Sequence, residues 1–309
     1  MDSSLVTKSS IAVAIPCHNE ASTIGKVVRD FRKALPDCKV YVFDNASTDN
    51  SSALAISEGA SVFRVAALGK GHALHSIFDE LEEDIIVLVD GDDTYLADEV
   101  PALMKPVLDG EADMVVGERL AAASDENMQR MNQLGNRLIV GYINRLFGTR
   151  YRDVLSGYRV FNRRFVESVP VLTTGFEVET EITLQALAEG LRVVEVPIHY
   201  RRRPGDSRSK LRPFADGYRI VLTAAILLRD HRPLRLFGSV AIAFWIMALV
   251  AGIFRLRSFF GQGSLPDSIL GGIVLLSVPT GLIALGIGLS LNAINTRFQE
   301  IKNFLRRSR

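Results

Sequence analysis

The sequence predicts an α/β protein with a mostly parallel, doubly wound sheet, followed by a hairpin of two membrane-spanning helices. Short apolar runs typical of buried strands alternate with helical patterns through about residue 200. Alternation of this kind places helices on both faces of a parallel sheet. Two long uncharged stretches follow beyond residue 235. A chain of 309 residues is long enough to bury a large core in its first part.

Each element of the first part is indicated by an apolar pattern and by the residues that bound it. The first strand is closed by Pro16, and a helical pattern then runs from Glu20 to about Leu35. The second strand ends in a run rich in Asp, Asn and Ser, which favours turns and helix caps. The predicted strands are 11–15, 39–43, 61–65, 85–89, 113–117, a strand fed by a turn within 153–161, and 192–196. The predicted helices cover 20–35, 72–81, 97–108, most of 119–151, and 175–189.

The fourth strand ends in a group of carboxylates. Five apolar residues, 85–89, lie between Asp84 and Asp90, a pattern that fits a fully covered parallel strand. Ligands of open α/β sheets bind beyond the carboxyl ends of the strands, where Asp90 and Asp92 would project. Two hard oxygen ligands separated by Gly91 suit Mg²⁺ or Mn²⁺ shared with a diphosphate. A solvated acidic turn is the alternative for such a short motif.

Composition excludes several classes of protein. The net charge of +1 argues against a nucleic-acid binder. Only Cys17 and Cys38 are present, so there is neither a disulfide framework nor a four-cysteine zinc site, and a reducing cytosol suits the bulk of the chain. The first ten residues do not have the pattern of a secretory signal.

The last third combines a basic segment, an amphipathic helix and two apolar spans. Residues 201–212 hold six basic residues and one acid, and the helical pattern follows from Pro213. The stretches 236–254 and 268–296 carry no charge over 19 and 29 residues, enough to cross a bilayer. Basic residues outside the hairpin outnumber those between the spans, which predicts both ends in the cytoplasm. We therefore expect a cytoplasmic catalytic domain (1–212), an interfacial helix (213–232), two transmembrane helices (233–296, about 236–254 and 269–294) and a basic tail (297–309).

Six motifs in this order resemble those of the family 2 glycosyltransferases with a GT-A fold, and within them the polyprenyl-phosphate glycosyltransferases, the group that includes dolichyl-phosphate mannose synthases. The resemblance covers about residues 10–212 and is carried by the motifs IPCHNE at 15–20, DNASTD at 44–49, GKG at 69–71, DGD at 90–92, SGYR at 156–159 and GDSRSK at 205–210. It implies a sugar-nucleotide donor, Mg²⁺ or Mn²⁺, inversion at the anomeric carbon, and a lipid phosphate acceptor.

The resemblance also implies roles for individual residues around the donor. Glu20 would take a ribose hydroxyl, and Asp44 would face the base; the chain has Asp44-Asn45 where the family usually has two adjacent acids. Lys70 would add positive charge near the diphosphate, unless it is simply a solvated residue at a helix start. The donor-nucleotide set is Pro16, Asn19, Glu20, Asp44, Asn45, Lys70, Asp90, Gly91 and Asp92, with Asp90 and Asp92 holding the metal.

The acceptor decides which groups the chemistry needs. A sugar hydroxyl requires a positioned base, whereas a phosphate monoester, with a second pKa of about 6, is already largely ionised and needs cations to position it. Arginine matches phosphate oxygens in a bidentate manner. The candidate acceptor-phosphate residues are Arg119, Arg137, Arg159, Arg203, Arg208, Ser209 and Lys210. Their alternative role is contact with lipid headgroups.

Three further acids are candidates for contacts with the reacting sugars. Asp153 could act as a base or orient the acceptor, and Glu179 and Glu181 could contact hydroxyls of the donor sugar. Acids in a first helical turn are also favoured by the helix dipole without any catalytic role. The predicted catalytic set is Asp92, Asp153, Arg203 and Lys210.

The resulting hypothesis is the transfer of one sugar from a nucleotide donor to a polyprenyl or dolichyl phosphate on the cytoplasmic leaflet. A UDP-sugar such as UDP-glucose or UDP-N-acetylglucosamine is favoured as donor, and GDP-mannose remains open. One alternative is a membrane glycosyltransferase acting on a saccharide or lipid hydroxyl; another is a silent scaffold or sugar-nucleotide sensor. The only tryptophan, Trp245, lies within the first span, which counts against the QxxRW motif of processive synthases. Glycines in the second span would permit close approach of helices within one chain or between the chains of a homo-oligomer.

Overall fold

The computed structural model describes residues 9–120, 140–145, 148–201, 203, 213–259 and 266–307. The chain divides into two compact units, Met1–Ala224 and Ala225–Arg309. The helical prediction for 119–151 is met at 140–145, and most of the remaining stretch lies outside the described residues.

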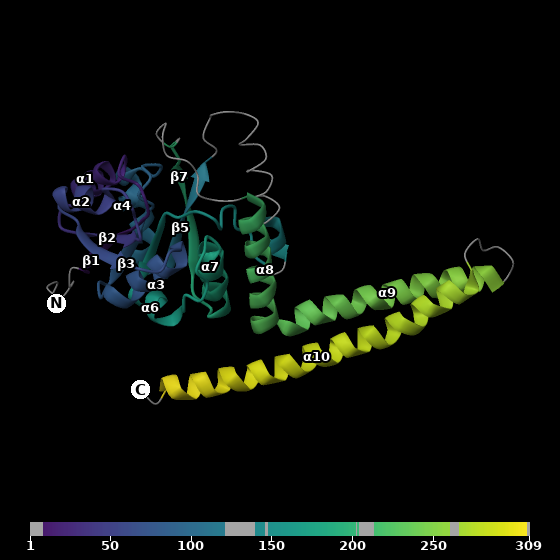
Figure 1. Cartoon of the computed structure of the whole chain (residues 1–309). Coiled ribbons are helices and arrows are strands. Elements are labelled where there is room, and N and C mark those ends of the chain that lie inside the picture. Colours follow the sequence, from purple (N-terminus) through teal and green to yellow (C-terminus); the bar gives the residue numbers. More distant parts are fainter. Residues whose placement is uncertain are drawn as a thin grey trace. The chain divides into compact units, whose positions relative to one another are not determined.

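The first unit is built on a sheet, of which Figure 1 labels β1, β2, β3, β5 and β7. The described strands of this sheet follow the order β3-β2-β1-β4-β6-β5-β7. These strands are β1 (Ile11–Cys17), β2 (Lys39–Asn45), β3 (Ser61–Val65), β4 (Ile85–Leu88), β5 (Met114–Leu120), β6 (Arg159–Asn162) and β7 (Val193–His199). All pairs are parallel except the two formed by β6, which runs antiparallel to β4 and β5. The prediction of a mostly parallel α/β sheet is confirmed.

Helices cover both faces of this sheet, so that it has a hydrophobic core on each side. Along β1, Val13 and Ile15 belong to one core and Ala12 and Ala14 to the other, as the period of two of a strand requires. Residues of α1 and α4 complete the first core, and residues of α3, α6 and α7 complete the second. The helices are α1 (Ile24–Ala34), α2 (Ser51–Ser57), α3 (Lys70–Glu80), the short 3₁₀ helix η1 (Ala97–Glu99), α4 (Val100–Leu108), α6 (Arg163–Ser168) and α7 (Val178–Ala188).

The direction of β6 matters for the site. Arg159, at the start of β6, pairs with Leu88, at the end of β4. The turn that precedes β6 therefore lies beside the carboxyl end of β4. If β6 ran parallel to β4, the carboxyl end of β6 would lie there instead. This arrangement places Ser156 and Gly157 at the same end of the sheet as Asp90 and Asp92, which follow β4.

The second unit contains the two apolar helices. Helix α8 (Pro213–His231) includes the boundary between the units, and α9 (Pro233–Phe259) packs against α10 (Asp267–Arg307). The segments Pro233–Arg257 and Ser268–Phe298 have mean hydropathies of 2.3 and 2.1 and are long enough to cross a bilayer. Only 17% and 22% of their most apolar windows are buried, unlike the core helix of a soluble protein. The segment expected as a basic tail continues α10 as helix through Arg307.

Trp245 and Gly281 bring these two helices close together. A Cβ atom at Gly281 would lie 2.4 Å from the indole Nε1 of Trp245, so only glycine leaves room for the ring. The tryptophan is therefore part of the contact between the helices, in line with its exclusion from a processive-synthase motif.

Candidate active site

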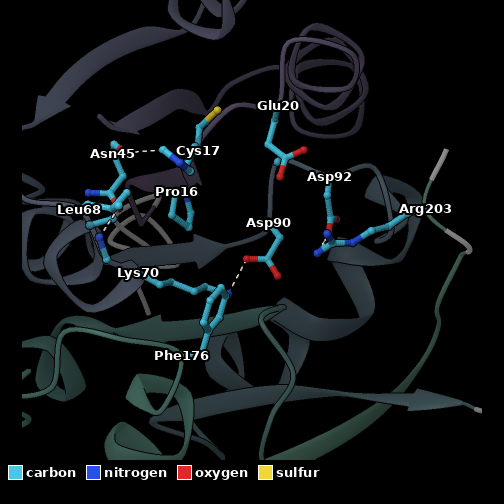
Figure 2. Close-up of a pocket in the computed structure, with 14 residues that line it drawn as sticks. Pro16, Cys17, Glu20, Asn45, Leu68, Lys70, Asp90, Asp92, Phe176 and Arg203 are labelled. Carbon is cyan, nitrogen blue, oxygen red and sulfur yellow. Dashed lines mark hydrogen bonds and ion pairs between the residues drawn. The ribbon is translucent and has the colours of Figure 1, made fainter. Parts of the chain in front are cut away.

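A pocket of about 320 Å³ lies at the carboxyl ends of β1 and β4 (Figure 2). The chain continues from β1 to β2 and β3 on one side of this point, and β4 lies on the other side, so the strand order reverses here. Such a switch point is where open α/β sheets bind ligands. The pocket is lined by Pro16, Cys17, His18, Glu20, Asn45, Leu68, Gly69, Lys70, Ala73, Asp90, Gly91, Asp92, Phe176 and Arg203.

Asp92 is nearly enclosed, and both of its carboxylate oxygens have partners. Its Oδ1 accepts hydrogen bonds from the hydroxyl and the backbone N–H of Thr94, at 2.6 and 3.2 Å. Its Oδ2 lies 2.5 Å from an Nη atom of Arg203. Burial and the neighbouring charge of Asp90 raise the pKa of Asp92, although Arg203 and Thr94 act in the opposite direction. The structure thus places Asp92 and Arg203 together in the pocket.

Asp93 points elsewhere. Its φ of 58° is in the left-handed region, and its carboxylate lies 2.6 Å from Nζ of Lys26 on α1. Neither Asp93 nor Lys26 lines the pocket. Within the described residues, the acidic pair available to a ligand is therefore Asp90 and Asp92.

Lys70 connects the acidic pair to α7. Its Nζ lies 2.6 Å from Asp90 and 2.5 Å from Glu179. Burial alone lowers the pKa of Lys70, but the two carboxylates outweigh burial and raise it well above its usual value. Lys70 is therefore a fixed cation in the pocket wall, and its alternative reading as a solvated residue is wrong. Glu179, expected to contact the sugar, instead holds this lysine.

Glycines explain why the sequence folds this way around Lys70. A Cβ atom at Gly157 would lie 2.4 Å from Asp90 Oδ2 and 3.0 Å from Lys70 Nζ, so the absence of a side chain leaves room for the ion pair. At Gly71 it would lie 1.9 Å from the carbonyl oxygen of Thr173. The backbone N–H of Gly71 donates to the carbonyl of Thr174 at 3.0 Å. The absence of a side chain at Gly71 therefore lets the 173–174 loop pack against the start of α3.

The end of β1 and the turn after it supply pocket residues and one connector. Pro16 and Glu20 line the pocket, and Glu20 is only 7% exposed. Asn19, with a φ of 50°, does not line it. Its Oδ1 accepts a 2.7 Å hydrogen bond from the backbone N–H of Thr48, which joins the turns after β1 and β2. Asn19 therefore stabilises the turns next to the pocket without lining it, and this geometry does not support its predicted contact with the nucleoside.

Of the two predicted residues at the end of β2, only one lines the pocket. Asn45 lines the pocket; its amide bridges the carbonyl of Ala67 and the N–H of Gly69, at 2.5 and 2.7 Å. Asp44 accepts hydrogen bonds from the backbone of Ser47 and the hydroxyl of Ser52. Burial raises the pKa of Asp44, but these hydrogen bonds lower it further, to a net value below normal. Asp44 stabilises its own turn and does not line the pocket.

Arg119 and Asp153 form an ion pair, and neither of them lines the pocket. Two nitrogens of the guanidinium lie 2.6 and 2.9 Å from the two oxygens of Asp153, which is 4% exposed. The guanidinium also lies 5.5 Å from the ring centre of Tyr200. Burial alone lowers the pKa of Arg119, but Asp153 and Tyr95 raise it above normal. A carboxylate whose two oxygens are held by one arginine is poorly suited to act as a base, so the structure corrects that expectation for Asp153.

Two other predicted residues are structural. Arg159 is fully buried, and its guanidinium donates to the carbonyls of Ser156 and Val154 and to the hydroxyl of Thr183. Burial lowers its pKa to about 10. Arg159 has no open side toward an acceptor phosphate, which corrects its predicted role.

Glu181 is likewise committed to the fold. Its carboxylate accepts hydrogen bonds from the backbone of Leu172 and Thr173 and from the amide of Gln185, and it is 1% exposed. It anchors the loop that docks on α3, which corrects its predicted contact with the donor sugar. Arg137, Arg208, Ser209 and Lys210 lie outside the described residues.

Sequence reasoning missed several pocket residues. Leu68 and Gly69 directly precede Lys70, so the motif at 69–71 could have indicated this stretch. Phe176 enters the pocket opposite Pro16 because the 173–174 loop docks on α3, and no local pattern marks it (Figure 2). Cys17 is buried beside Ser51, and burial raises the pKa of its thiol to about 12.

The donor atoms of the pocket suit a divalent cation that shares a diphosphate. Among the described residues there is no cluster of three or more His, Cys, Asp or Glu that could hold a metal by itself. Mg²⁺ is commonly bound through one or two carboxylates together with substrate phosphates. Asp90 and Asp92 provide that set, so the residues fit a metal that is completed by its ligand.

Comparisons with known proteins find a matching family model and similar relatives. Residues 12–169, about half of the chain, match the model of glycosyl transferase family 2. Glycosyltransferase AglJ of Haloferax volcanii is 34% identical over 77% of this chain and 78% of its own length. Dolichyl-phosphate hexose transferase of the same organism is 29% identical over 68% and 90%.

A likeness in structure supports the fold. Glucosyl-3-phosphoglycerate synthase from Mycobacterium tuberculosis, in complex with Mn²⁺, UDP-glucose and phosphoglyceric acid, superposes with a TM-score of 0.61 at 23% identity, over 71% of this chain and 80% of that one. The fold is therefore the GT-A type of α/β sheet. With its family match, its relatives and this fold, the chain belongs to glycosyl transferase family 2.

Proposed function

We propose that this protein transfers one hexose, with inversion, from a nucleotide-sugar donor to a polyprenyl or dolichyl phosphate at a membrane surface. The donor is a UDP-sugar such as UDP-glucose or UDP-N-acetylglucosamine, with GDP-mannose as the other donor to test. The observation that carries this proposal is the combination of Asp90, Asp92, Lys70 and Arg203 in one pocket of a chain that ends in two apolar helices.

The donor half of the proposal rests on the pocket. Asp90 and Asp92 would hold Mg²⁺ or Mn²⁺, and the metal would neutralise the charge that develops on the departing nucleoside diphosphate. Lys70 is a fixed cation on the same side as Asp90 and would interact with the diphosphate. The pocket is also lined by the uncharged residues Pro16, Asn45 and Leu68. The base and the ribose of the donor would contact this less charged part of the lining.

The acceptor half rests on chemistry and on relatives. The named activity of the 29% identical relative is transfer of hexose to dolichyl phosphate. A phosphate monoester is largely dianionic near neutral pH and does not need a base, and both oxygens of Asp153 are already engaged. Arg203 and Arg119 are the described cations that would position such a phosphate. For this reason we do not favour a hydroxyl acceptor.

The hairpin would hold the enzyme at the bilayer that contains its lipid acceptor. We place the catalytic unit and both ends of the hairpin on the cytoplasmic side, because basic residues before the first span and after the second outnumber those between the spans. Reaction of a cysteine introduced at Gln262, between the spans, with an impermeant reagent from outside intact cells would test this topology. Labelling only after lysis would contradict it.

The decisive experiment is nucleoside diphosphate release by the detergent-purified full chain with Mn²⁺. A panel of UDP- and GDP-sugars is tested with polyprenyl phosphate, with the corresponding polyprenol and without lipid. Release that requires the phosphate supports the proposal and identifies the donor. Asp92→Asn is the negative control, with an expected loss of roughly 10²-fold or more because metal-bound charge is lost from the transition state.

The other outcomes identify the alternatives. Release with the polyprenol or a saccharide, but not with the phosphate, would establish a hydroxyl acceptor and overturn the proposed acceptor class. Nucleotide binding without release under any condition, unchanged in Asp92→Asn, would establish a sugar-nucleotide sensor or scaffold.

A further inference from the structure

Each carboxylate of the acidic pair is paired with a cation from a distant part of the chain. Asp90 pairs with Lys70 at 2.6 Å, and Asp92 pairs with Arg203 at 2.5 Å. A divalent cation bound to both carboxylates needs oxygen lone pairs on this same side of the pocket. Because Thr94 occupies the other oxygen of Asp92, Arg203 sits on the oxygen that remains for a metal.

The two cations are not held equally. Lys70 lies between two carboxylates, Asp90 and Glu179, and its side chain is 13% exposed. Arg203 is paired with Asp92, and its side chain is 28% exposed. Lys70 can leave Asp90 room for a metal while Glu179 still holds it, whereas Arg203 must give up the Asp92 oxygen.

We propose that Arg203 and the divalent cation compete for the carboxylate of Asp92, so that the metal binds weakly alone and tightly together with a diphosphate. A diphosphate offers oxygens to both cations that the metal displaces, and the arginine fork is well matched to them. Resting on the proposed function, this inference adds that the freed Arg203 becomes available to a phosphate only once the donor and metal are bound. By linkage, the metal must strengthen diphosphate binding by the same factor.

The experiment measures Mn²⁺ affinity of the full chain in detergent at about pH 8, where carboxylates are ionised. Titrations follow free Mn²⁺ by electron paramagnetic resonance, alone and with saturating UDP or GDP. The variants are Arg203→Gln and Arg203→Lys, and thermal unfolding checks that each is folded. The matched control is Lys26→Gln, which removes an equal charge from Asp93, next to the acidic pair but outside the pocket.

The expected result is that Arg203→Gln binds Mn²⁺ alone roughly fivefold or more tightly, the scale of one charged hydrogen bond released. Its further gain from the nucleotide should be smaller than that of the wild type. Arg203→Lys should fall between the two, and Lys26→Gln should change neither value by more than about twofold.

Unchanged or weaker Mn²⁺ binding by Arg203→Gln, or an equal effect of Lys26→Gln, would overturn the competition. The measurement contains no acceptor, so its result is separate from that of the release assay. If neither nucleotide binds, the proposed donor class is wrong, and the titrations with Mn²⁺ alone still decide whether Arg203 competes.

Discussion

At the scale of residues, Asp153 shows how the partners of a carboxylate determine its chemistry. Its position just before Ser156-Gly157 suggested a base, but Arg119 engages both of its oxygens. A base must have a free lone pair near the proton that it removes. Asp153 is instead expected to position Arg119 beside Tyr200, and through it the acceptor phosphate.

Asp153→Asn should lower kcat/KM for the lipid phosphate by about tenfold, since the arginine loses its fork-shaped partner. The pH profile of kcat/KM should keep its shape, because no base has been removed. In a double-mutant cycle with Arg119→Lys, the losses should be less than additive. Disappearance of the acid limb of the profile in Asp153→Asn would instead show that this carboxylate is the base.

Gly157 makes a second prediction at this scale. Gly157→Ala places a methyl group 2.4 Å from Asp90 Oδ2, so the Asp90–Lys70 pair must move. We expect kcat/KM for the donor to fall by roughly tenfold or more, as measured by initial rates at several donor concentrations. The control is Gly141→Ala, an exposed helical position with open space around it, where activity should not change. Equal rates for both variants would contradict this role of Gly157.

At the scale of elements, Asp113 ties three strands together at the end of the sheet opposite the site. Its carboxylate accepts hydrogen bonds from Asn162, at the end of β6, and from the backbone N–H of Arg192, just before β7. Burial alone raises the pKa of Asp113, but Arg192 and Asn162 lower it to about 2. This carboxylate therefore stabilises the fold when it is ionised.

The sign of this effect sets a pH window. A depressed carboxyl pKa contributes stability that is fully present above the unfolded value of about 3.9 and is lost as the pH falls toward about 2. Asp113→Asn should lower the free energy of unfolding by roughly 2 kcal/mol at neutral pH and weaken its acid dependence, as followed by urea denaturation. The surface variant Asp109→Asn should change it by no more than about 0.5 kcal/mol. Equal curves for Asp113→Asn and wild type would refute the assignment.

At the scale of the whole molecule, the proposed chemistry and the proposed membrane anchoring fall in different compact units. Every residue that lines the pocket falls within Met1–Ala224, and both apolar helices fall within Ala225–Arg309. The second unit would then raise the local concentration of a membrane-bound acceptor without taking part in the reaction. Tethering of this kind adds roughly 10²-fold or more to an encounter.

A chain ending at residue 231 tests this division of labour. It should bind nucleotide as the full chain does and should turn over a short, water-soluble isoprenyl phosphate at a similar rate. With long-chain polyprenyl phosphate in vesicles its rate should fall roughly 10²-fold, because the tether is lost. The two rates are compared in the same release assay, and equal rates on vesicles would show that the hairpin is not required for access to the lipid.

The sequence by itself determined the parts of this protein that depend on local pattern. Period-two and period-3.6 apolar patterns predicted the strands, the mostly parallel sheet and the longer helices, but not the short helices α2 and α6, and uncharged length predicted the two apolar helices. Asp90, Asp92, Lys70 and Pro16, which line the pocket, could be selected from the sequence because motif and strand end coincide. The antiparallel direction of β6 could not, since it depends on pairing with β4 and β5 and not on its own four residues.

Only the tertiary structure decided what each charged side chain does. In the sequence, nothing distinguishes the charged residues Arg159, Glu181 and Asp153 from Arg203 and Asp92, because a motif shows only residue type and spacing. Their burial and their partners differ. Arg159 and Glu181 form hydrogen bonds with backbone groups and neighbouring side chains, whereas Arg203 and Asp92 form an ion pair in the pocket. Such contacts join residues that are far apart in the chain. The free-energy cost of burying a charged side chain depends on these contacts and not on its neighbours in the sequence.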